Sequence, residues 1–266
     1  MILLTGATGT IGRVTQAAPR APNAAFKVAA CNPAELHALG VPSIAFDWDQ
    51  LSCDLPMLQG VDRPFLPTPN SEWQVDYMLQ AVGDIVRVSV IGANAEPGII
   101  LGRQYFAAER EIRASGIGRT MLRPTFFMDN FIREYGVDPH KDSQVYLPNG
   151  DGKAAWVDPA DVGKVGEVAV KVLCSDSYAG SDIDLTGPAL LSTAEALSVL
   201  SSVLGHRYTY VDVSEQAACD AMDKTGLPAW LADAFLKLNA LIRQGHAASL
   251  TRGVQQVLGC PPHSMR

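Results

Sequence analysis

Three glycines follow the first apolar run of the chain at regular spacing. The run "MILLT" leads directly into Gly6, Gly9 and Gly12, which form the pattern G-x-x-G-x-x-G. A strand that turns into a helix in this way presents free backbone N–H groups and a helix dipole to a pyrophosphate. The alternative is an ordinary glycine-rich turn. We expect a dinucleotide-binding loop whose contacts come from Gly6, Thr8, Gly9, Thr10, Ile11 and Gly12.

A second group of residues has the types needed for proton transfer. Ser89 ends an apolar run, and Tyr105 stands four residues before Glu109 in a helical pattern. At that spacing Tyr105 and Glu109 share one face of the helix. A nearby carboxylate raises the pKa of a phenol, so the pair is poorly suited to ordinary acid–base exchange. We keep Ser89, Tyr105 and Glu109 as catalytic candidates; the alternative is a partly buried tyrosine beside an exposed glutamate.

The segment "LRPTFFMDNF", from Leu122 to Phe131, carries side chains suited to a flat apolar pocket. Such pockets combine aromatic walls with a few polar groups that orient the ligand. The alternative for all of them is a place in the hydrophobic core. The candidate pocket residues are Phe126, Phe127, Met128, Asn130 and Trp156.

The elements that must position these residues are short apolar runs alternating with helical patterns. The runs are "MILL", "FKVAA", "SIAF", "VRVSVIGA" and "RTMLRP". Runs of this kind are typical of strands buried on both faces, and their alternation with helices predicts an α/β fold with a doubly wound parallel sheet. The ligand cleft is expected at the carboxyl ends of the strands.

The second half of the chain has a different pattern. The pairs Asn149-Gly150 and Asp151-Gly152 between apolar flanks predict a hairpin excursion near 145–157. From Ser192, which with Glu195 forms a capping box, the pattern is mostly helical. We expect a Rossmann-type domain over 1–190 and a smaller, mostly helical substrate-binding part over 191–266. The apolar stripe of "LPAWLADAFLKLNALIRQ" is expected to pack on the sheet domain, or else to form a dimer contact.

Composition excludes several classes of function. The 266 residues are 47% hydrophobic and 18% charged, with a formal net charge of −7. This balance argues against nucleic acid or an anionic membrane as a partner, because both attract basic surfaces. No apolar window is long enough to span a bilayer and no basic leader precedes "ILL", so we expect a cytoplasmic protein. Five cysteines and five histidines show no metal-ligand spacing, and we expect no metal site.

Several of these segments together resemble one family. The landmarks are "LLTGATGTIGR", "VSVIGA", "LGRQYFAAEREIRASGIGRTMLRPTFFMDNF", "LPNGDGKAAWVDPADVGKV" and "DLTGPALLSTAEALSVLSSVLGHRYTYVDVS". They look like successive motifs of the NmrA-like family, the atypical short-chain dehydrogenase/reductases. The resemblance covers most of the chain. It implies a Rossmann domain that binds NADP or NAD, and members that reduce quinones, imines and related small molecules or that sense the dinucleotide without turnover.

The chain also departs from the family pattern. Pro19 and Pro22 should end the first helix early, since an interior proline costs about 3 kcal/mol. Pro64 and Pro67 interrupt the expected fourth strand. Asp47 matches an acidic position that faces the adenine in the family. Cys31 stands where a basic or acidic residue would select NADP or NAD, so the preference stays open and weakened binding is expected.

Three functions remain open at this stage. The first is an NAD(P)H-dependent reductase of a small conjugated molecule such as a quinone, enone or imine. The second is a non-redox isomerase, cyclase or lyase of natural-product biosynthesis, with Tyr105, Glu109 or Asp129 transferring the proton. The third is a regulator that senses the dinucleotide. Short-chain dehydrogenases pair their tyrosine with lysine in Y-x-x-x-K, whereas position 109 is Glu, so in a reductase water or the cofactor ribose would relay the proton.

Overall fold

The computed structural model describes residues 1–6, 26–30, 32–38, 43–46, 59–66, 84–96, 98–157, 172 and 176–265. Its larger part is a seven-stranded sheet with the order β3-β2-β1-β4-β5-β6-β9, and all neighbours are parallel. The strands are β1 (Ile2–Leu4), β2 (Phe26–Ala30), β3 (Ile44–Ala45), β4 (Arg63–Leu66), β5 (Asp84–Val88), β6 (Gly118–Pro124) and β9 (Asp182–Leu185). The Rossmann-type fold expected from the apolar runs is confirmed.

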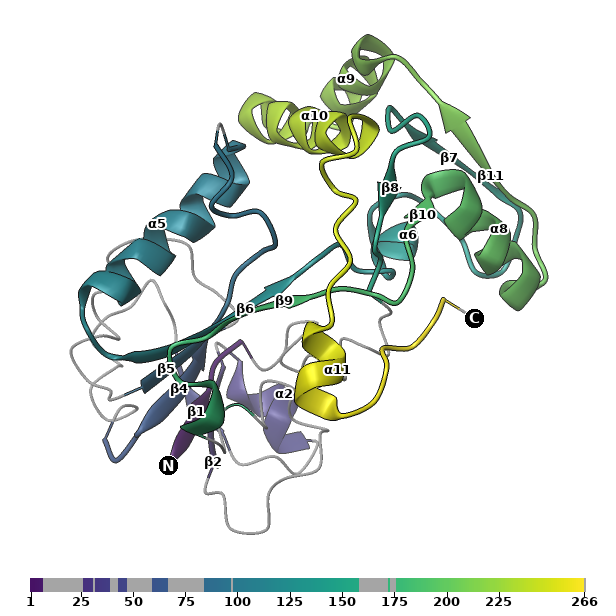
Figure 1. Cartoon of the computed structure of the whole chain (residues 1–266). Coiled ribbons are helices and arrows are strands. Elements are labelled where there is room, and N and C mark those ends of the chain that lie inside the picture. The colour runs from purple at the N-terminus through teal and green to yellow at the C-terminus, as the bar shows by residue number, and fades with distance from the viewer. Residues whose placement is uncertain are drawn as a thin grey trace.

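The order of the strands creates a switch point between β1 and β4. The chain runs outward from β1 to β3 and then returns to the other side of β1, where β4 begins the second half of the sheet (Figure 1). In sheets of this kind the crevice beyond the carboxyl ends of the strands at the switch point is the usual ligand site. The first glycine of the motif, Gly6, follows β1 at this point.

Pro67 lies outside the described residues, and Pro64 does not interrupt the fourth strand, contrary to expectation. It lies inside β4 opposite Leu3 of β1. The N–H of Arg63 and the carbonyl of Phe65 face β1, where they bond to Met1 and Thr5. Since alternate residues bond to opposite sides, Pro64 faces β5, where the N–H of Asp84 already donates to the carbonyl of Asp62 over 3.3 Å. The strand therefore continues past Pro64 although the proline has no N–H to donate on the β5 side.

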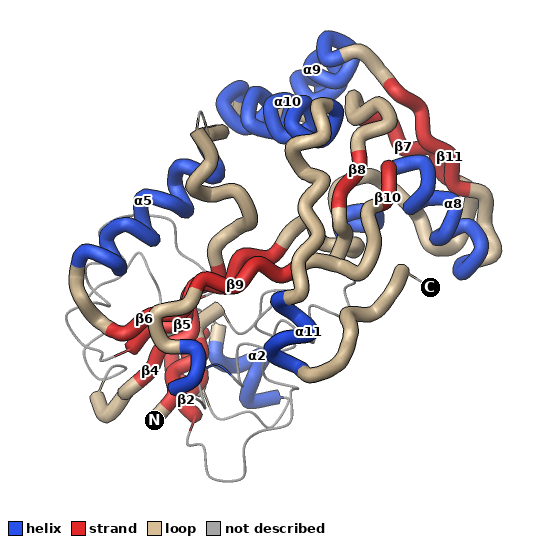
Figure 2. Tube along the Cα trace, viewed as in Figure 1, coloured by secondary structure: helices blue, strands red, loops and turns tan. Residues whose placement is uncertain are grey.

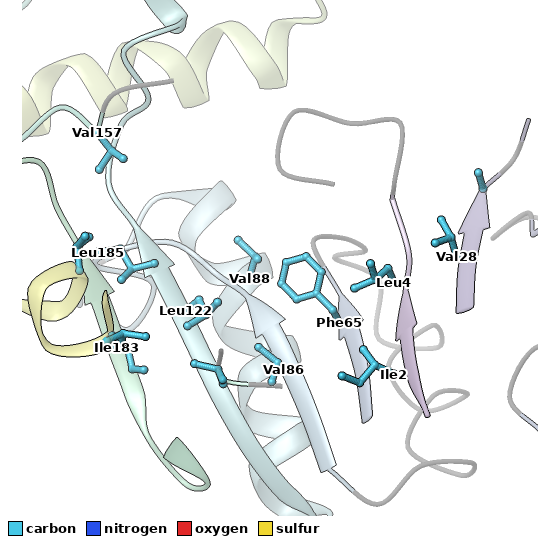
Figure 3. Packing of buried hydrophobic residues seen from close by; sticks show 14 of the residues in the cluster. Ile2, Leu4, Val28, Phe65, Val86, Val88, Leu122, Val157, Ile183 and Leu185 are labelled. Atoms are coloured by element: carbon cyan, nitrogen blue, oxygen red, sulfur yellow. The ribbon is translucent and has the colours of Figure 1, made fainter. Parts of the chain in front are cut away.

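Helices cover both faces of this sheet. One face carries α5 (Ile100–Ala114), whose Ala108 and Ile112 pack with Ile85 and Met121. The opposite face carries α2 (Pro33–Ala38) and α11 (Gly253–Leu258). Figure 3 shows the core on that second face, with Phe65 between its neighbours on the central strands and Ile183 and Leu185 at the β9 edge. Two apolar layers thus hold the sheet. Of these helices, α5 is the one that carries the catalytic candidates Tyr105 and Glu109.

A smaller part is built beside the carboxyl ends of the strands (Figure 2). Its strands form two pairs: β7 with β11, parallel, and β8 with β10, antiparallel. Its elements are α6 (Asn130–Arg133), β7 (Ser143–Leu147), β8 (Lys153–Ala154), β10 (Leu191–Ser192), α8 (Thr193–Leu204), β11 (Tyr208–Asp212), α9 (Glu215–Lys224) and α10 (Ala229–Arg243). A short 3₁₀ turn, η2 (Asp176–Tyr178), precedes β9. The expected capping box is present, because Ser192 and Glu195 exchange their hydrogen bonds at the start of α8.

The excursion near 145–157 leaves the main sheet, but it is not a hairpin. Its flanking strands β7 and β8 pair with β11 and β10 instead of with each other. The turn between them packs on α10: Arg243 donates from Nε to the carbonyl of Pro148 over 2.8 Å. Gly150 has a left-handed φ of 54°. The glycines that suggested a hairpin are required instead by this turn and by its close approach to a helix.

The helix α10 also differs from expectation. Its apolar stripe was expected on the sheet domain, yet α10 packs chiefly on α9 and on the segment around β8. Figure 1 shows α10 in the smaller part, apart from the strands of the main sheet. The last helix, α11, is the element that returns to the sheet, where it packs beside β9. Within the described ranges, no helix combines the length and apolarity that crossing a bilayer requires.

Candidate active site

The carboxyl end of β1 leads into the first glycine of the motif, which has a left-handed backbone conformation. Gly6 has a φ of 60°, a left-handed conformation that favours glycine. Thr5 is fixed before it, since its N–H and its hydroxyl both donate to the carbonyl of Phe65, over 3.3 and 3.0 Å. These residues lie at the β1–β4 switch point and therefore suit a dinucleotide pyrophosphate. The remaining residues of this prediction lie outside the described ranges: Thr8, Gly9, Thr10, Ile11, Gly12 and Asp47, together with Pro19, Pro22 and Cys31.

The three catalytic candidates gather between β5 and α5. Ser89 directly follows β5, and its N–H donates to the carbonyl of Leu122 over 2.7 Å. Alternate residues of a strand share a face, so Arg87 and Ser89 face α5 together with Ile85. On α5, Tyr105 is half-buried and Glu109 lies one turn further along. Glu109 is fully buried, whereas the alternative interpretation placed it in solvent.

Glu109 is the centre of a buried ion-pair network. Arg123 on β6 donates from Nε to Oε1 of Glu109 over 2.9 Å and from Nη2 to Oε2. Arg113, one turn further on α5, donates to the same Oε2 over 3.3 Å. Both arginines also pair with Asp182 at the start of β9, with 3.4 Å between Arg123 Nη2 and Asp182 Oδ2. The network therefore joins α5 to two neighbouring strands.

Electrostatics keep this network ionised. Burial by itself raises the pKa of Glu109, but the hydrogen bonds and the charge of Arg123, together with the hydrogen bond from Arg113, outweigh it, so the pKa is lowered. The hydrogen bond to Glu109 raises the pKa of Arg123. Burial lowers the pKa of Arg87 to about 10, which leaves it charged at neutral pH. Glu109 is thus a permanent anion under ordinary conditions and holds no proton to deliver.

The network was missed in the sequence, although signals for it exist. A charged residue stands inside each of the buried runs "IVRVSV" and "TMLRP", where solvent cannot satisfy it. Glu109 and Arg113 have the i,i+4 spacing of a helical ion pair. Such signals show that a buried charge needs a partner without saying which partner it meets. That choice depends on the register of β6 against β9, which aligns Arg123 with Asp184.

The candidate pocket segment follows β6 and lies at the junction of the two parts. Phe127 packs against the core of the main sheet, while Phe126 packs against the core of the smaller part. Trp156 is 1% exposed, and its rings lie 5.4 Å from Phe126 and 4.9 Å from Phe131 between centroids. Trp156 also donates from Nε1 to the carbonyl of Leu191 over 3.1 Å. Trp156 therefore lies in the hydrophobic core, which was the alternative to a place in the pocket.

The other members of the segment divide between buried and accessible positions. Met128 is buried, whereas Phe126, Phe127 and Asn130 are half-buried. Asn130 begins α6, and its carbonyl accepts from the N–H of Tyr135 over 2.9 Å. Burial raises the pKa of the Tyr135 hydroxyl to about 12. Two backbone hydrogen bonds fix the segment to Val157. The N–H of Val157 donates to the carbonyl of Phe126 over 2.9 Å, and the N–H of Met128 donates to the carbonyl of Val157 over 2.7 Å. Within the described residues, no three His, Cys, Asp or Glu side chains gather as metal ligands.

Comparison with known proteins places this architecture in a family. The model of the NmrA-like family matches residues 93–243. An NAD(P)H azoreductase of Xenophilus azovorans is 32% identical over 273 aligned positions, which cover 98% of this chain and 94% of the relative. The chain belongs to the NmrA-like family. Expectation from the quoted motifs is thereby confirmed.

Two further comparisons extend along the whole chain. A (4-alkanoyl-5-oxo-2,5-dihydrofuran-3-yl)methyl phosphate reductase of Streptomyces griseus is 31% identical, and the alignment covers 100% of this chain and 95% of the relative. An NADPH-dependent quinone oxidoreductase of Escherichia coli, solved with NADPH, superposes with a TM-score of 0.83 at 24% identity. That superposition covers 100% of this chain and 97% of the other. At this identity the structural likeness shows the fold.

Proposed function

We propose that this NmrA-like chain is an NAD(P)H-dependent reductase of a small conjugated acceptor. The observation that carries the proposal is the turn at Gly6, left-handed and placed at the switch point of the parallel sheet. Relatives that align over nearly the whole chain are reductases by name, which supports the same activity. When bound at this turn, the dinucleotide would supply a hydride to the acceptor.

The described residues divide the remaining tasks. Half-buried Phe126 and Phe127 would line the flat pocket at the end of β6, with Asn130 as its polar member. Tyr105, also half-buried, is the catalytic candidate that can contact a substrate. Glu109 is ionised and paired, so the proton that follows the hydride would come from water or the cofactor ribose. Acceptors whose reduced form takes a proton from solvent fit this site best.

The non-redox alternative loses part of its support. It drew on Pro64 and Pro67 as interruptions of the fourth strand, yet Pro64 lies within a paired β4, and Pro67 lies outside the described residues. Its second support, the early end of the first helix at Pro19 and Pro22, lies outside the described residues. The regulator alternative needs dinucleotide binding without turnover. Both alternatives make predictions that differ from those of a reductase.

A spectrophotometric assay separates the three. Purified protein is mixed with NADPH or NADH and a quinone, an enone or an azo dye, and loss of absorbance at the nicotinamide band is followed. The proposal predicts acceptor-dependent oxidation that Gly9→Asp abolishes, because the new carboxylate obstructs and repels a pyrophosphate. Gly102→Ala is the matched control, since a Cβ there meets nothing closer than 3.7 Å. Binding without oxidation of any acceptor would favour the regulator instead.

A further inference from the structure

The ion pair between Glu109 and Arg123 connects two walls of the proposed reductase site. Glu109 lies one turn from Tyr105 on α5. Arg123 is the penultimate residue of β6, and the chain continues through Pro124 and Thr125 into Phe126. The pair therefore stands between the helix that carries the tyrosine and the strand that leads into the aromatic segment.

The geometry of the pair fixes orientation as well as distance. The guanidinium of Arg123 donates through two nitrogens to the two carboxylate oxygens of Glu109, an arrangement that holds both planar groups in one relative orientation. The Glu109 side chain is 0% exposed and that of Arg123 is 10% exposed. Water can therefore barely replace either partner. A buried pair of this kind resists sliding of α5 along the sheet, because any shift leaves charge uncompensated.

Backbone contacts transmit this position to the site. The N–H of Ile91, just beyond Ser89, donates to the carbonyl of Pro124 over 3.1 Å. The N–H of Thr125 donates to the carbonyl of Leu185 on β9 over 3.0 Å. The strand end after Arg123 is thus held on both sides, so the remaining freedom is that of α5 above it. Glu109 ties α5 to β6 through Arg123, while Arg113 ties the same helix to Asp182 on β9.

We propose that Glu109 is a positioning residue that acts through Arg123. It sets the place of Tyr105 relative to the segment beginning at Phe126, and it neither contacts the substrate nor transfers a proton. This inference rests on the proposed reductase function for its kinetic consequence. Its structural consequence, a shared constraint on α5 and on the end of β6, is independent of that function.

The kinetic test compares Glu109→Gln with the parent, using menadione as acceptor and NADPH as donor. We expect kcat/KM to fall roughly tenfold to a hundredfold, as misplacement of reacting groups produces. The shape of the pH profile should not change, and the Kd of NADPH should stay that of the parent. Arg110→Ala, an exposed neighbour on α5, is the matched control and should retain the parent kinetics. Loss of one limb of the pH profile in Glu109→Gln would overturn the proposal in favour of proton transfer.

Hydrogen–deuterium exchange tests the constraint without any turnover. In Glu109→Gln, exchange should rise more in α5 around 103–109 and in the segment 124–128 than in β1 and β2, whose amides report only the loss of global stability. Arg123→Lys keeps the charge but loses the two-pronged contact, and it should give the same pattern if Glu109→Gln does not fold. A rise confined to α5 in the folded variant would refute the connection. Lack of NADPH oxidation by the parent, with the exchange pattern as expected, would refute the reductase function alone.

Discussion

The backbone of Gly152 lies directly against the carbonyl oxygen of Ile242, so that a Cβ atom on Gly152 would stand 2.0 Å from that oxygen. This contact seats the turn between β7 and β8 on the last turn of α10. Arg243 strengthens it by bonding to Pro148 and to Asp212. The smaller part of the fold thus depends on close backbone approach as well as on apolar packing.

Gly152→Ala should therefore push α10 away from the turn. We expect a loss of about 1 to 3 kcal/mol in the free energy of unfolding, the usual cost of forcing atoms into a packed region. Urea denaturation followed by circular dichroism measures it. Gly102→Ala is the control, because alanine there has room and favours the helix by up to about 1 kcal/mol. Equal stability of the two variants would mean that the turn and α10 are not in contact.

The paired carboxylate of Glu109 should make stability depend on acid. Its pKa is lowered in the folded state, so its contribution is present above the ordinary value of 4.5 and is lost as pH falls through the folded value. Burial raises the pKa of Asp184 in the same network, and protonation of Asp184 partly offsets this loss. Urea unfolding between about pH 5 and about pH 3 should show the parent losing stability faster than Glu109→Gln. Parallel curves would contradict the assignment.

At neutral pH the same substitution should be costly. Removing one charge of a buried pair leaves the other uncompensated, which typically costs about 3 to 5 kcal/mol. Glu109→Gln should lose about 3 kcal/mol, at the lower end, because an amide oxygen still accepts from Arg123 and Arg113 can pair with Asp182. Lys237→Gln, which removes an exposed pair with Asp233, should change little and serves as the control.

Trp156 and Phe126 should behave differently although both belong to the predicted pocket. Trp156→Phe removes the hydrogen bond to the carbonyl of Leu191 and leaves a cavity. We expect the free energy of unfolding to fall by about 2 kcal/mol and the KM of the acceptor to stay unchanged. Phe126→Leu should alter that KM with a smaller effect on stability. Thermal unfolding and steady-state kinetics on both variants decide the matter. A changed KM in Trp156→Phe would return that residue to the pocket.

Much of this architecture could be predicted from sequence because it depends on local patterns. Buried strands such as "MILL" and "FKVAA" are apolar on both faces, and Ser192 with Glu195 signals the start of α8 through hydrogen bonds only three residues apart. The partners of β7 and β8 could not be predicted, because glycine pairs mark a turn without saying what packs against it. Pro64 was misjudged for a similar reason, since its effect depends on which neighbour its nitrogen faces.

The candidate site was only partly predictable. Residue types marked Gly6, Ser89 and Tyr105, and the fold places them near the carboxyl ends of β1 and β5. The pairing of Glu109 with Arg123 could not be derived, because Arg123 lies 14 positions further along the chain and meets Glu109 only through the packing of α5 on the sheet. The residue type alone therefore suggested an exposed glutamate at position 109, whereas the structure buries this carboxylate.

Calorimetric titration shows directly whether the turn at Gly6 binds a nicotinamide dinucleotide. Parent protein, Gly9→Asp and Gly102→Ala are titrated with NADPH, NADP, NADH and NAD. The account predicts saturable binding of at least one reduced nucleotide by the parent and by Gly102→Ala, and its loss in Gly9→Asp. Absence of binding in the parent up to millimolar nucleotide, the weak end of specific affinities at about 4 kcal/mol, would contradict it.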